Sequence, residues 1–311
     1  MKIVNQQAQL LKQEFGETRE EIIDHTYQHA ARCAGVCYAS SKTYDNPEDA
    51  KAFVNNILIA HKHFSPLAHA AVYLDLSNYE DDYDAYNRLL QLREFDHNAV
   101  KYATFYDYHK NPNGEEKDSD NWIDNCRMVV VTTFRFIIQY NLLDIFKKYC
   151  VSYDYVKTNI NPNLEFKDVI TPTYSVLCDT SRVIATEFNR HAANVAICGQ
   201  STRYCNLSND KKFKDIEFVK SVVPCDFTTR LTMRLCMYVS SLSYRLLIHH
   251  GVKPEIARSI LLMNLHTQMV YSANMEEWDY IFNVRINGMT GIPHPDAKDL
   301  AIKIKSAIEN E

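Results

Sequence analysis

Hydrophobic and polar residues are arranged along the N-terminal part of the chain in patterns that predict two helices and a strand. Residues 17–33 form an amphipathic helical pattern with acidic residues in its first turn. The run Asn46–Asp49 reads Asn-Pro-Glu-Asp, which is typical of a helix start, and this helix is expected to extend to about His61. Ala70–Leu76 alternates in the manner of a strand.

The rest of the chain is expected to contain further strands followed by long helices. The expected elements are a buried strand at 128–133, a helix near 134–148, a strand near 169–178 that leads through Asp179, Thr180 and Ser181 into a helix from about Arg182, and a short strand at 216–223. From Asp226 to the end the pattern is nearly all helical, with Pro254 at one helix start. This order favours an α+β fold, with an antiparallel sheet flanked by long helices, over a regular βαβ array.

One segment stands apart from these elements. Residues 77–121 are aromatic and acidic and end in NPNGEEKDSDN, which is typical of a solvated loop. The chain contains no internal repeat, no low-complexity tract and no linker. The sequence therefore predicts a single domain over 1–311 with an extended insert at about 77–125.

Composition and charge exclude several classes of protein. The net charge of −5 is not the basic field of a non-specific nucleic-acid binder, so we expect any anionic partner to be a small ligand held by local cations. No run approaches the roughly 20 apolar residues of a membrane span, and the N-terminus lacks a signal-peptide core, so a cytoplasmic location is expected. The nine cysteines form no C-x-x-C pair and are expected to be mostly buried. The seven glycines form neither G-x-G-x-x-G nor a P-loop, so any nucleotide is bound without a Rossmann or Walker cradle.

Two neighbouring groups of residues are candidates for anion binding. Glu187, Arg190 and His191 share one face of the predicted helix, a pattern that by itself also suits a solvated charged surface. About ten residues later, Ser201 and Arg203 lie two positions apart on a predicted loop. A hydroxyl and a guanidinium at this spacing can hold a phosphate together.

Three other groups allow more than one interpretation. His63, Ser65 and the following residues form a turn whose histidines are either functional or structural. In the C-terminal helical region Arg285 follows the apolar run around Trp278 and needs an anionic or carbonyl partner if it is half-buried. His25, His29 and Cys33 share one helical face, which indicates either a polar stripe at a subunit or domain contact or a metal site.

Five segments together resemble the flavin-dependent thymidylate synthases. NRHAANVAICGQSTRYCNLS is similar to the family signature of Arg-His-Arg, a short gap and Ser-x-Arg-Tyr, and HFSPLAH resembles its H-x-[ST]-x-x-E-H segment. GVCYASSKTY, the helical region from GVKPEIARS to WDYIFNVR, and HPDAKDLA resemble three more family segments in the same order. The similarity extends over roughly 22–305 and is broken by longer material between His69 and Arg190.

The resemblance implies a fold, an activity and a set of site residues. It implies a homotetramer with shared active sites that converts dUMP to dTMP, with FAD and NADPH as redox cofactors and methylenetetrahydrofolate as the one-carbon donor. It implies neither a resident metal nor a cysteine nucleophile, and Arg285 would lie against the uracil and polarise it. The residues implied for FAD are His63, Ser65, Arg190, His191, Asn274 and His294. Those implied for dUMP are Glu187, Arg190, Gln200, Ser201, Arg203, Arg258 and Arg285.

The chain also departs from the family pattern. Ala192 replaces the third signature residue, Gln200 replaces the acidic residue before the serine, and Ala68 replaces the glutamate of the turn. The segment from Arg285 to His294 is long. Two alternatives therefore stay open: a divergent member that binds FAD or nucleotide with little turnover and serves as a binding or assembly protein, and a metal-dependent nucleotide hydrolase that uses the His25 and His29 face.

Overall fold

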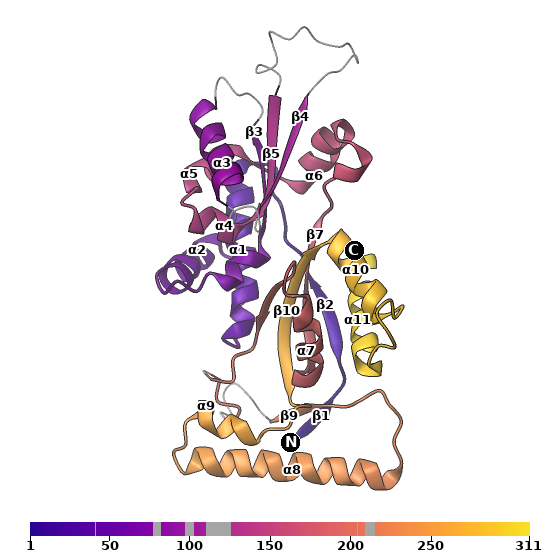
Figure 1. Cartoon of the computed structure of the whole chain (residues 1–311). Coiled ribbons are helices and arrows are strands. Elements are labelled where there is room, and N and C mark those ends of the chain that lie inside the picture. Colours follow the sequence, from indigo (N-terminus) through magenta and orange to yellow (C-terminus); the bar gives the residue numbers. More distant parts are fainter. Residues whose placement is uncertain (41, 77–81, 97–102, 110–125, 204, 209–214) are drawn as a thin grey trace. The chain divides into compact units, whose positions relative to one another are not determined.

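The chain forms two compact units (Figure 1). The structure is a computed structural model that describes residues 1–311 except 41, 77–81, 97–102, 110–125, 204 and 209–214. Unit 1 comprises residues 1–12, 32–43 and 173–311, and unit 2 comprises residues 13–31 and 44–172. The expectation of a single domain over 1–311 stays a prediction.

Unit 2 is built on a four-stranded antiparallel sheet of order β4-β5-β3-β6. Strand β3 is buried along its whole length, so the alternation expected at 70–76 is not that of a half-exposed strand. The strands are β3 (Ala71–Leu76), β4 (Thr104–His109), β5 (Cys126–Thr133) and β6 (Cys150–Val151). The helices of this unit and of the segment that joins it to unit 1 are α1 (Arg19–Cys37), α2 (Pro47–Phe53), α3 (Tyr83–Phe95), α4 (Phe134–Gln139), α5 (Leu143–Tyr149) and α6 (Tyr153–Tyr155).

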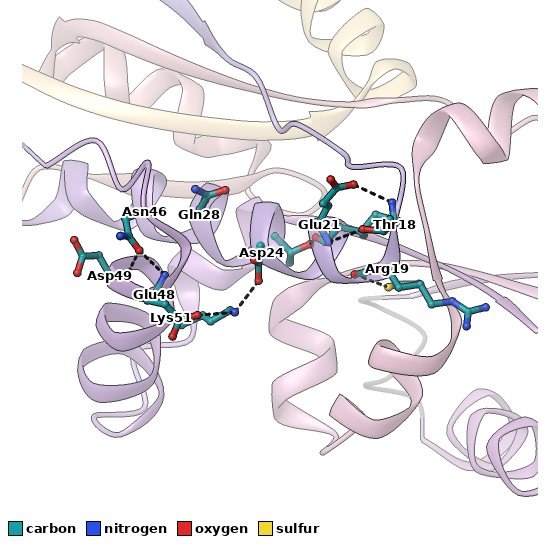
Figure 2. Close-up of polar contacts among 12 residues, drawn as sticks. Thr18, Arg19, Glu21, Asp24, Gln28, Asn46, Glu48, Asp49 and Lys51 are labelled. Atoms are coloured by element: carbon teal, nitrogen blue, oxygen red, sulfur yellow. Dashed lines mark hydrogen bonds and ion pairs between the residues drawn. The ribbon is translucent and has the colours of Figure 1, made fainter.

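Both helix starts predicted near the N-terminus are confirmed, and Figure 2 shows the contacts that fix them. Thr18 and Glu21 form a capping box, in which the Thr18 N–H donates to Glu21 Oε2 at 3.0 Å and the Glu21 N–H donates to Thr18 Oγ1 at 3.3 Å. Asn46 Oδ1 accepts from the Glu48 N–H at 2.8 Å at the start of α2. The second helix continues in π-helical geometry over Val54–Ile59.

One expectation for unit 2 is wrong in detail, and one segment contains elements that were not expected. The single helix expected near 134–148 is divided into α4 and α5, because Asn141 adopts a left-handed backbone with φ of 55°. The predicted insert at 77–125 contains α3 and β4, which the acidic and aromatic composition did not indicate. The predicted loop at 111–121 lies outside the described residues.

Unit 1 is built on a second four-stranded antiparallel sheet, of order β2-β7-β10-β8. The central strand β10 contradicts the expectation of helix from Asp226 onward. It is buried through most of its length between two neighbours, so it lacks the alternating pattern of a half-exposed strand. The strands are β2 (Gln7–Leu11), β7 (Thr173–Ser181), β8 (Ala196–Gly199) and β10 (His266–Asn274).

The sheet of unit 1 is covered on both faces. On one face Val176, Cys178, Met269 and Tyr271 pack with the apolar sides of α7 (Arg182–Phe188), α10 (Met275–Arg285) and α11 (Pro295–Glu309). On the other face Val270 packs with Cys198 and with Cys33 from the C-terminal part of α1. Adjacent strand residues thus face opposite layers, as the strand geometry requires. Trp278, Ile281 and Phe282 belong to the first of these cores.

The remaining elements form a third apolar cluster of unit 1. Strands β1 (Lys2–Val4) and β9 (Glu217–Val219) pair in parallel beside α8 (Phe227–His249) and α9 (Pro254–Ala257). Pro254 starts a helix as predicted. Among the described residues, no helix is long and apolar enough to cross a membrane. The α+β class with antiparallel sheets and flanking helices is therefore confirmed.

Candidate active site

Helix α7 and the turn after it carry the first group of predicted site residues. Ser181 caps α7 by accepting from the Ile184 N–H at 3.3 Å, as expected for a serine between a strand and a helix. Phe188 is buried in the core, and a 3₁₀ turn over Asn189–His191 follows. This turn alters the straight-helix spacing assumed from the sequence, but Glu187 and His191 still face the same neighbour.

That neighbour is Arg285, at the C-terminal end of α10. Its Nη1 donates to Glu187 Oε2 at 3.1 Å, its Nη2 donates to the Glu187 carbonyl oxygen, and its Nε donates to His191 Nε2 at 3.2 Å. Arg285 is only 9% exposed, and a buried arginine was expected to need an anionic or a carbonyl partner. Glu187 supplies both, one from its side chain and one from its backbone. We call Glu187, His191 and Arg285 the arginine–glutamate cluster.

The contact with Arg285 fixes the protonation of His191. Nε2 accepts a hydrogen bond, so the imidazole is neutral with its proton on Nδ1. Burial lowers the pKa of His191, and the positive charge of Arg285 lowers it further. The ring lies near Phe188 and Tyr280, with centroid distances of 6.5 and 6.1 Å. The cluster therefore holds one buried cation beside a neutral imidazole.

Arg285 retains donor capacity for a ligand. A guanidinium has five N–H groups, and three of them are used in the contacts above, which leaves two with no acceptor among the described residues. One face of the guanidinium lies over the Phe188 ring, with Cζ 5.8 Å from its centroid. A planar cation held in this way can donate to a carbonyl or an anion without reorienting.

The loop after β8 carries the second group. Gly199 pairs directly with Met269, and a side chain at this position would collide with the Met269 sulfur, so only glycine fits without rearrangement. The Gln200 N–H donates to the Gln268 carbonyl at 2.8 Å, and the Ser201 N–H donates to the Cys37 carbonyl at 3.0 Å. These two backbone bonds anchor the loop at the end of β8.

Three arginines lie in or beside this loop. Arg203 lies in it and is exposed, with Nε 3.9 Å from Glu255 Oε2, a distance that gives a weak ion pair at most. Arg258 donates from Nη1 to Thr202 Oγ1 at 3.0 Å, and Arg182 donates from Nη2 to the Gln200 carbonyl at 3.3 Å. Sequence reasoning missed Arg182. The only signal was an arginine directly after the cap residue of a helix, which is common in proteins.

Three of the predicted FAD residues of unit 1, Asn274, His294 and Arg190, are exposed and lie at helix ends. Asn274 caps α10 by accepting from the Glu277 N–H at 3.0 Å, and His294 Nδ1 accepts from the Asp296 N–H at 3.2 Å at the start of α11. Arg190 is 74% exposed and lies 3.9 Å from Glu187 Oε1. Both caps use an acceptor atom, so the amide NH₂ of Asn274 and the Nε2 of His294 stay available to a ligand.

The predicted FAD residues His63 and Ser65 belong to unit 2 and are exposed. Ser65 begins a 3₁₀ turn over Ser65–His69. The second histidine of this segment, His69, is fully buried, and burial together with the charge of His29 lowers its pKa to about 3. His69 is therefore neutral near pH 7.

The alternative metal site finds no support in the described part of the chain, where no group of three or more His, Cys, Asp or Glu is arranged to hold a metal ion. The buried thiols are also poor nucleophiles, because burial raises the pKa of Cys33 and Cys178 far above the usual range. The pKa of Cys198 is raised as well, by its contact with Cys37 and by burial.

The comparison with protein families identifies the segment that carries this site. Residues 171–309 match the model of the thymidylate synthase complementing protein family. The resemblance to that family is confirmed for this part of the chain. The matched segment contains the arginine–glutamate cluster, the 200–203 loop, and both Arg182 and Arg258.

Two solved structures show a weaker likeness. One is a UMP/dUMP methylase PolB from Streptomyces cacaoi bound with 5-Br dUMP, at 10% identity and a TM-score of 0.40, covering 100% of this chain and 93% of that chain. The other is the same methylase bound with 5-Br UMP, at 14% identity and a TM-score of 0.38, covering 44% of this chain and 69% of that chain. No curated protein matches the sequence. At these TM-scores the likenesses carry no argument about this chain.

Proposed function

We propose that the protein is a flavin-dependent thymidylate synthase that methylates dUMP to dTMP. The proposal rests on the arginine–glutamate cluster. Resemblance to the thymidylate synthase complementing proteins implicates its three residues, and the fold brings these residues into contact. Those residues are contributed by α7, the turn after it and α10, so their convergence depends on the tertiary fold of unit 1.

In this proposal Arg285 binds and polarises the uracil ring. Its two remaining N–H groups donate to a pyrimidine carbonyl and stabilise negative charge that develops there during methyl transfer. Glu187 acts as a positioning residue, since its carboxylate and carbonyl oxygen fix the guanidinium plane. His191 stays neutral and accepts from Nε of Arg285, so it adds no second positive charge near the ring.

The loop of residues 200–203 is proposed to bind the 5′-phosphate of dUMP. Ser201 and Arg203 offer a hydroxyl and a guanidinium, and the side chains of Gln200 and Arg258 lie on or beside the same loop. Arg182 and Glu187 are five positions apart on α7, which places them about 140° apart around the helix. The loop and the arginine–glutamate cluster therefore face different sides of α7, which suits an active site completed by a second subunit.

The chemistry of the exposed donors fits a flavin dinucleotide. Arg190 offers an exposed guanidinium for a diphosphate, and Asn274 and His294 offer donors at exposed helix starts. The family resemblance also implicates His191 in unit 1 and, separately, His63 and Ser65 in unit 2. When bound, the reduced flavin supplies the hydride that completes the methyl group. The overall balance is dUMP, methylenetetrahydrofolate, NADPH and a proton giving dTMP, tetrahydrofolate and NADP⁺.

A homotetramer is part of this proposal, and α8 offers the surface for it. This helix packs one side on the third core of unit 1 and exposes a row of large apolar side chains on the other. Their spacing of three and four residues is that of a helix–helix contact, and we propose that another copy of the chain covers them. The row consists of Phe227, Leu231, Leu235, Tyr238, Leu242 and Leu246, each at least 45% exposed.

One alternative keeps support from particular residues. Ala192 leaves the third signature position without a cation, and Gln200 leaves the position before the serine without a carboxylate. These substitutions favour a protein that binds nucleotide or flavin with little turnover.

The visible spectrum of the purified protein with FAD and dUMP, before and after anaerobic NADPH, separates the alternatives. Bleaching of a protein-bound flavin band supports the synthase. A bound flavin that NADPH does not reduce supports the binding protein. Absence of bound flavin contradicts the proposed cofactor.

A further inference from the structure

Arg182 and Arg258 approach the same loop from two different elements. Arg182, the first residue of α7, donates to the Gln200 carbonyl at 3.3 Å, and Arg258, in the 3₁₀ turn after α9, donates to the Thr202 hydroxyl at 3.0 Å. The two acceptors are the residues on either side of Ser201. The two guanidinium groups are therefore held around one serine, although their positions are 76 apart in the sequence.

Within the described part of the chain, this pair of like charges is not neutralised by a carboxylate. The pKa of Arg182 is lowered, first by burial of its half-buried guanidinium and second by the positive charge of Arg258. Among the described residues neither Arg182 nor Arg258 forms an ion pair with a carboxylate, whereas Arg203 on the same loop lies near Glu255. Two cations kept together in this way are unfavourable unless an external anion joins them.

The chemistry of the pair matches a phosphate monoester. Arg182 uses one N–H group in these contacts and Arg258 uses two, so each guanidinium keeps further donors for a ligand. A phosphate monoester carries close to two negative charges near pH 7 and offers three acceptor oxygens. Two arginine forks around a serine suit that charge and geometry better than a carboxylate or a neutral sugar.

We propose that Arg182 and Arg258 form a two-arginine clamp for the phosphate of a nucleoside monophosphate. Arg182 belongs to neither the signature of Arg-His-Arg nor Ser-x-Arg-Tyr, so it is an additional binding residue of this chain. The clamp rests on the proposed function for the identity of the nucleotide, dUMP. The preference of the clamp for a phosphate monoester is argued from the two arginines and does not depend on which nucleotide binds.

The test compares dUMP with deoxyuridine, which differs by the phosphate alone. Dissociation constants are measured by calorimetry for wild type, Arg182→Gln, Arg182→Lys, Arg258→Gln and the control Arg88→Gln. Arg88 in unit 2 also donates to a backbone carbonyl, that of Asn141, and forms an exposed ion pair with Asp144. Thermal unfolding of each variant checks that it is folded.

The clamp predicts that Arg182→Gln and Arg258→Gln each weaken dUMP binding by roughly 10- to 100-fold and leave deoxyuridine within about twofold. Arg182→Lys retains part of the affinity, because a point charge replaces the fork, and Arg88→Gln behaves as wild type. Equal losses for dUMP and deoxyuridine in Arg182→Gln would mean that Arg182 only holds the loop. Unchanged dUMP affinity in that variant would overturn the clamp and leave the proposed function intact.

A parallel measurement with inorganic phosphate separates failure of the clamp from failure of the proposed function. If the wild type binds no dUMP but phosphate raises its unfolding temperature in an Arg182-dependent manner, the clamp stands and the nucleotide is wrong. If neither dUMP nor phosphate stabilises the wild type, both proposals fail.

Discussion

Arg285 and Glu187, separated by 98 positions in the sequence, form an ion pair with an Nη1–Oε2 distance of 3.1 Å at the end of α10. The same arginine also donates to the Glu187 carbonyl oxygen and to His191 Nε2. The pair is largely withdrawn from water, with side-chain exposures of 11% and 28%. Its orientation is fixed before any ligand binds, which is the condition for efficient electrostatic stabilisation.

Replacing Glu187 by Gln should weaken both the fold and the activity. The substitution keeps the shape of the side chain but removes the charge that compensates the buried guanidinium, at a cost of about 1–3 kcal/mol. We expect kcat for dTMP formation to fall by more than the change in KM, because the guanidinium loses its fixed plane. Glu276→Gln is the control, since Glu276 lies nine residues before Arg285, or about 13.5 Å along the helix axis. An unchanged kcat in Glu187→Gln would argue against a positioning role.

Arg203→Ala should weaken dUMP binding by roughly 10- to 100-fold and leave flavin in place, because one charged contact to phosphate is lost. Calorimetry with dUMP and the absorbance of bound flavin measure the two effects separately. Glu255→Gln is the matched variant with the opposite expectation. Glu255 lies 3.9 Å from Arg203, so removing its charge should leave dUMP affinity equal to that of wild type or tighten it. Loss of dUMP binding in Glu255→Gln would contradict the assignment of the loop.

The lowered pKa of His191 predicts a pH dependence of stability. The imidazole is harder to protonate in the folded chain than in the unfolded chain, where the pKa is about 6.5. The unfolded state therefore binds more protons in acid, and stability is lost as the pH falls from about 6.5 toward the lowered pKa. Below that pKa His191 is protonated in both states, so its effect on the free energy of unfolding does not change further.

His191→Gln provides the comparison for this pH effect. An amide oxygen can still accept from Arg285 but does not titrate in this range. The drop in unfolding temperature between about pH 7.5 and about pH 5.5 should be smaller in the variant than in wild type. Equal drops in both proteins would show that protonation of His191 is not linked to folding.

The exposed row on α8 predicts self-association. Gel filtration or light scattering should give about four times the chain mass of 36.1 kDa. Leu235→Glu places a charge in the middle of the row and should dissociate the assembly, whereas Thr232→Glu, at an exposed position outside the row, should not. A tetramer that survives Leu235→Glu would place the subunit contact elsewhere. A monomeric wild type would contradict the proposal that subunits share active sites.

The sequence drew attention to the three residues of the arginine–glutamate cluster but could not predict their contacts. Family resemblance located Glu187, His191 and Arg285, but spacing alone could not show that one glutamate would supply both a carboxylate and a carbonyl to the same arginine. Arg182 was missed because its contact depends on where β8 ends. That end is set by the pairing of Gly199 with Met269.

The errors in the fold have similar physical causes. Strand β10 was missed because a strand paired on both edges and buried on both faces loses its alternation, and helical segments surround it in the sequence. Helix α3 was missed because acidic and aromatic residues dominate its neighbourhood. The helix starts predicted near residue 17 and at Asn46 were correct, because the signals at a helix start depend on a few adjacent residues.

Formation of dTMP from dUMP tests the central claim most directly. The purified protein is incubated anaerobically with dUMP, methylenetetrahydrofolate, FAD and NADPH, and nucleotides are separated and identified by mass spectrometry. We predict dTMP in the complete mixture, none when the folate, FAD or NADPH is omitted, and a large loss in Arg285→Lys, whose single ammonium cannot reproduce the guanidinium contacts. A protein that binds flavin and dUMP yet forms no dTMP would contradict the synthase and leave the binding protein in its place.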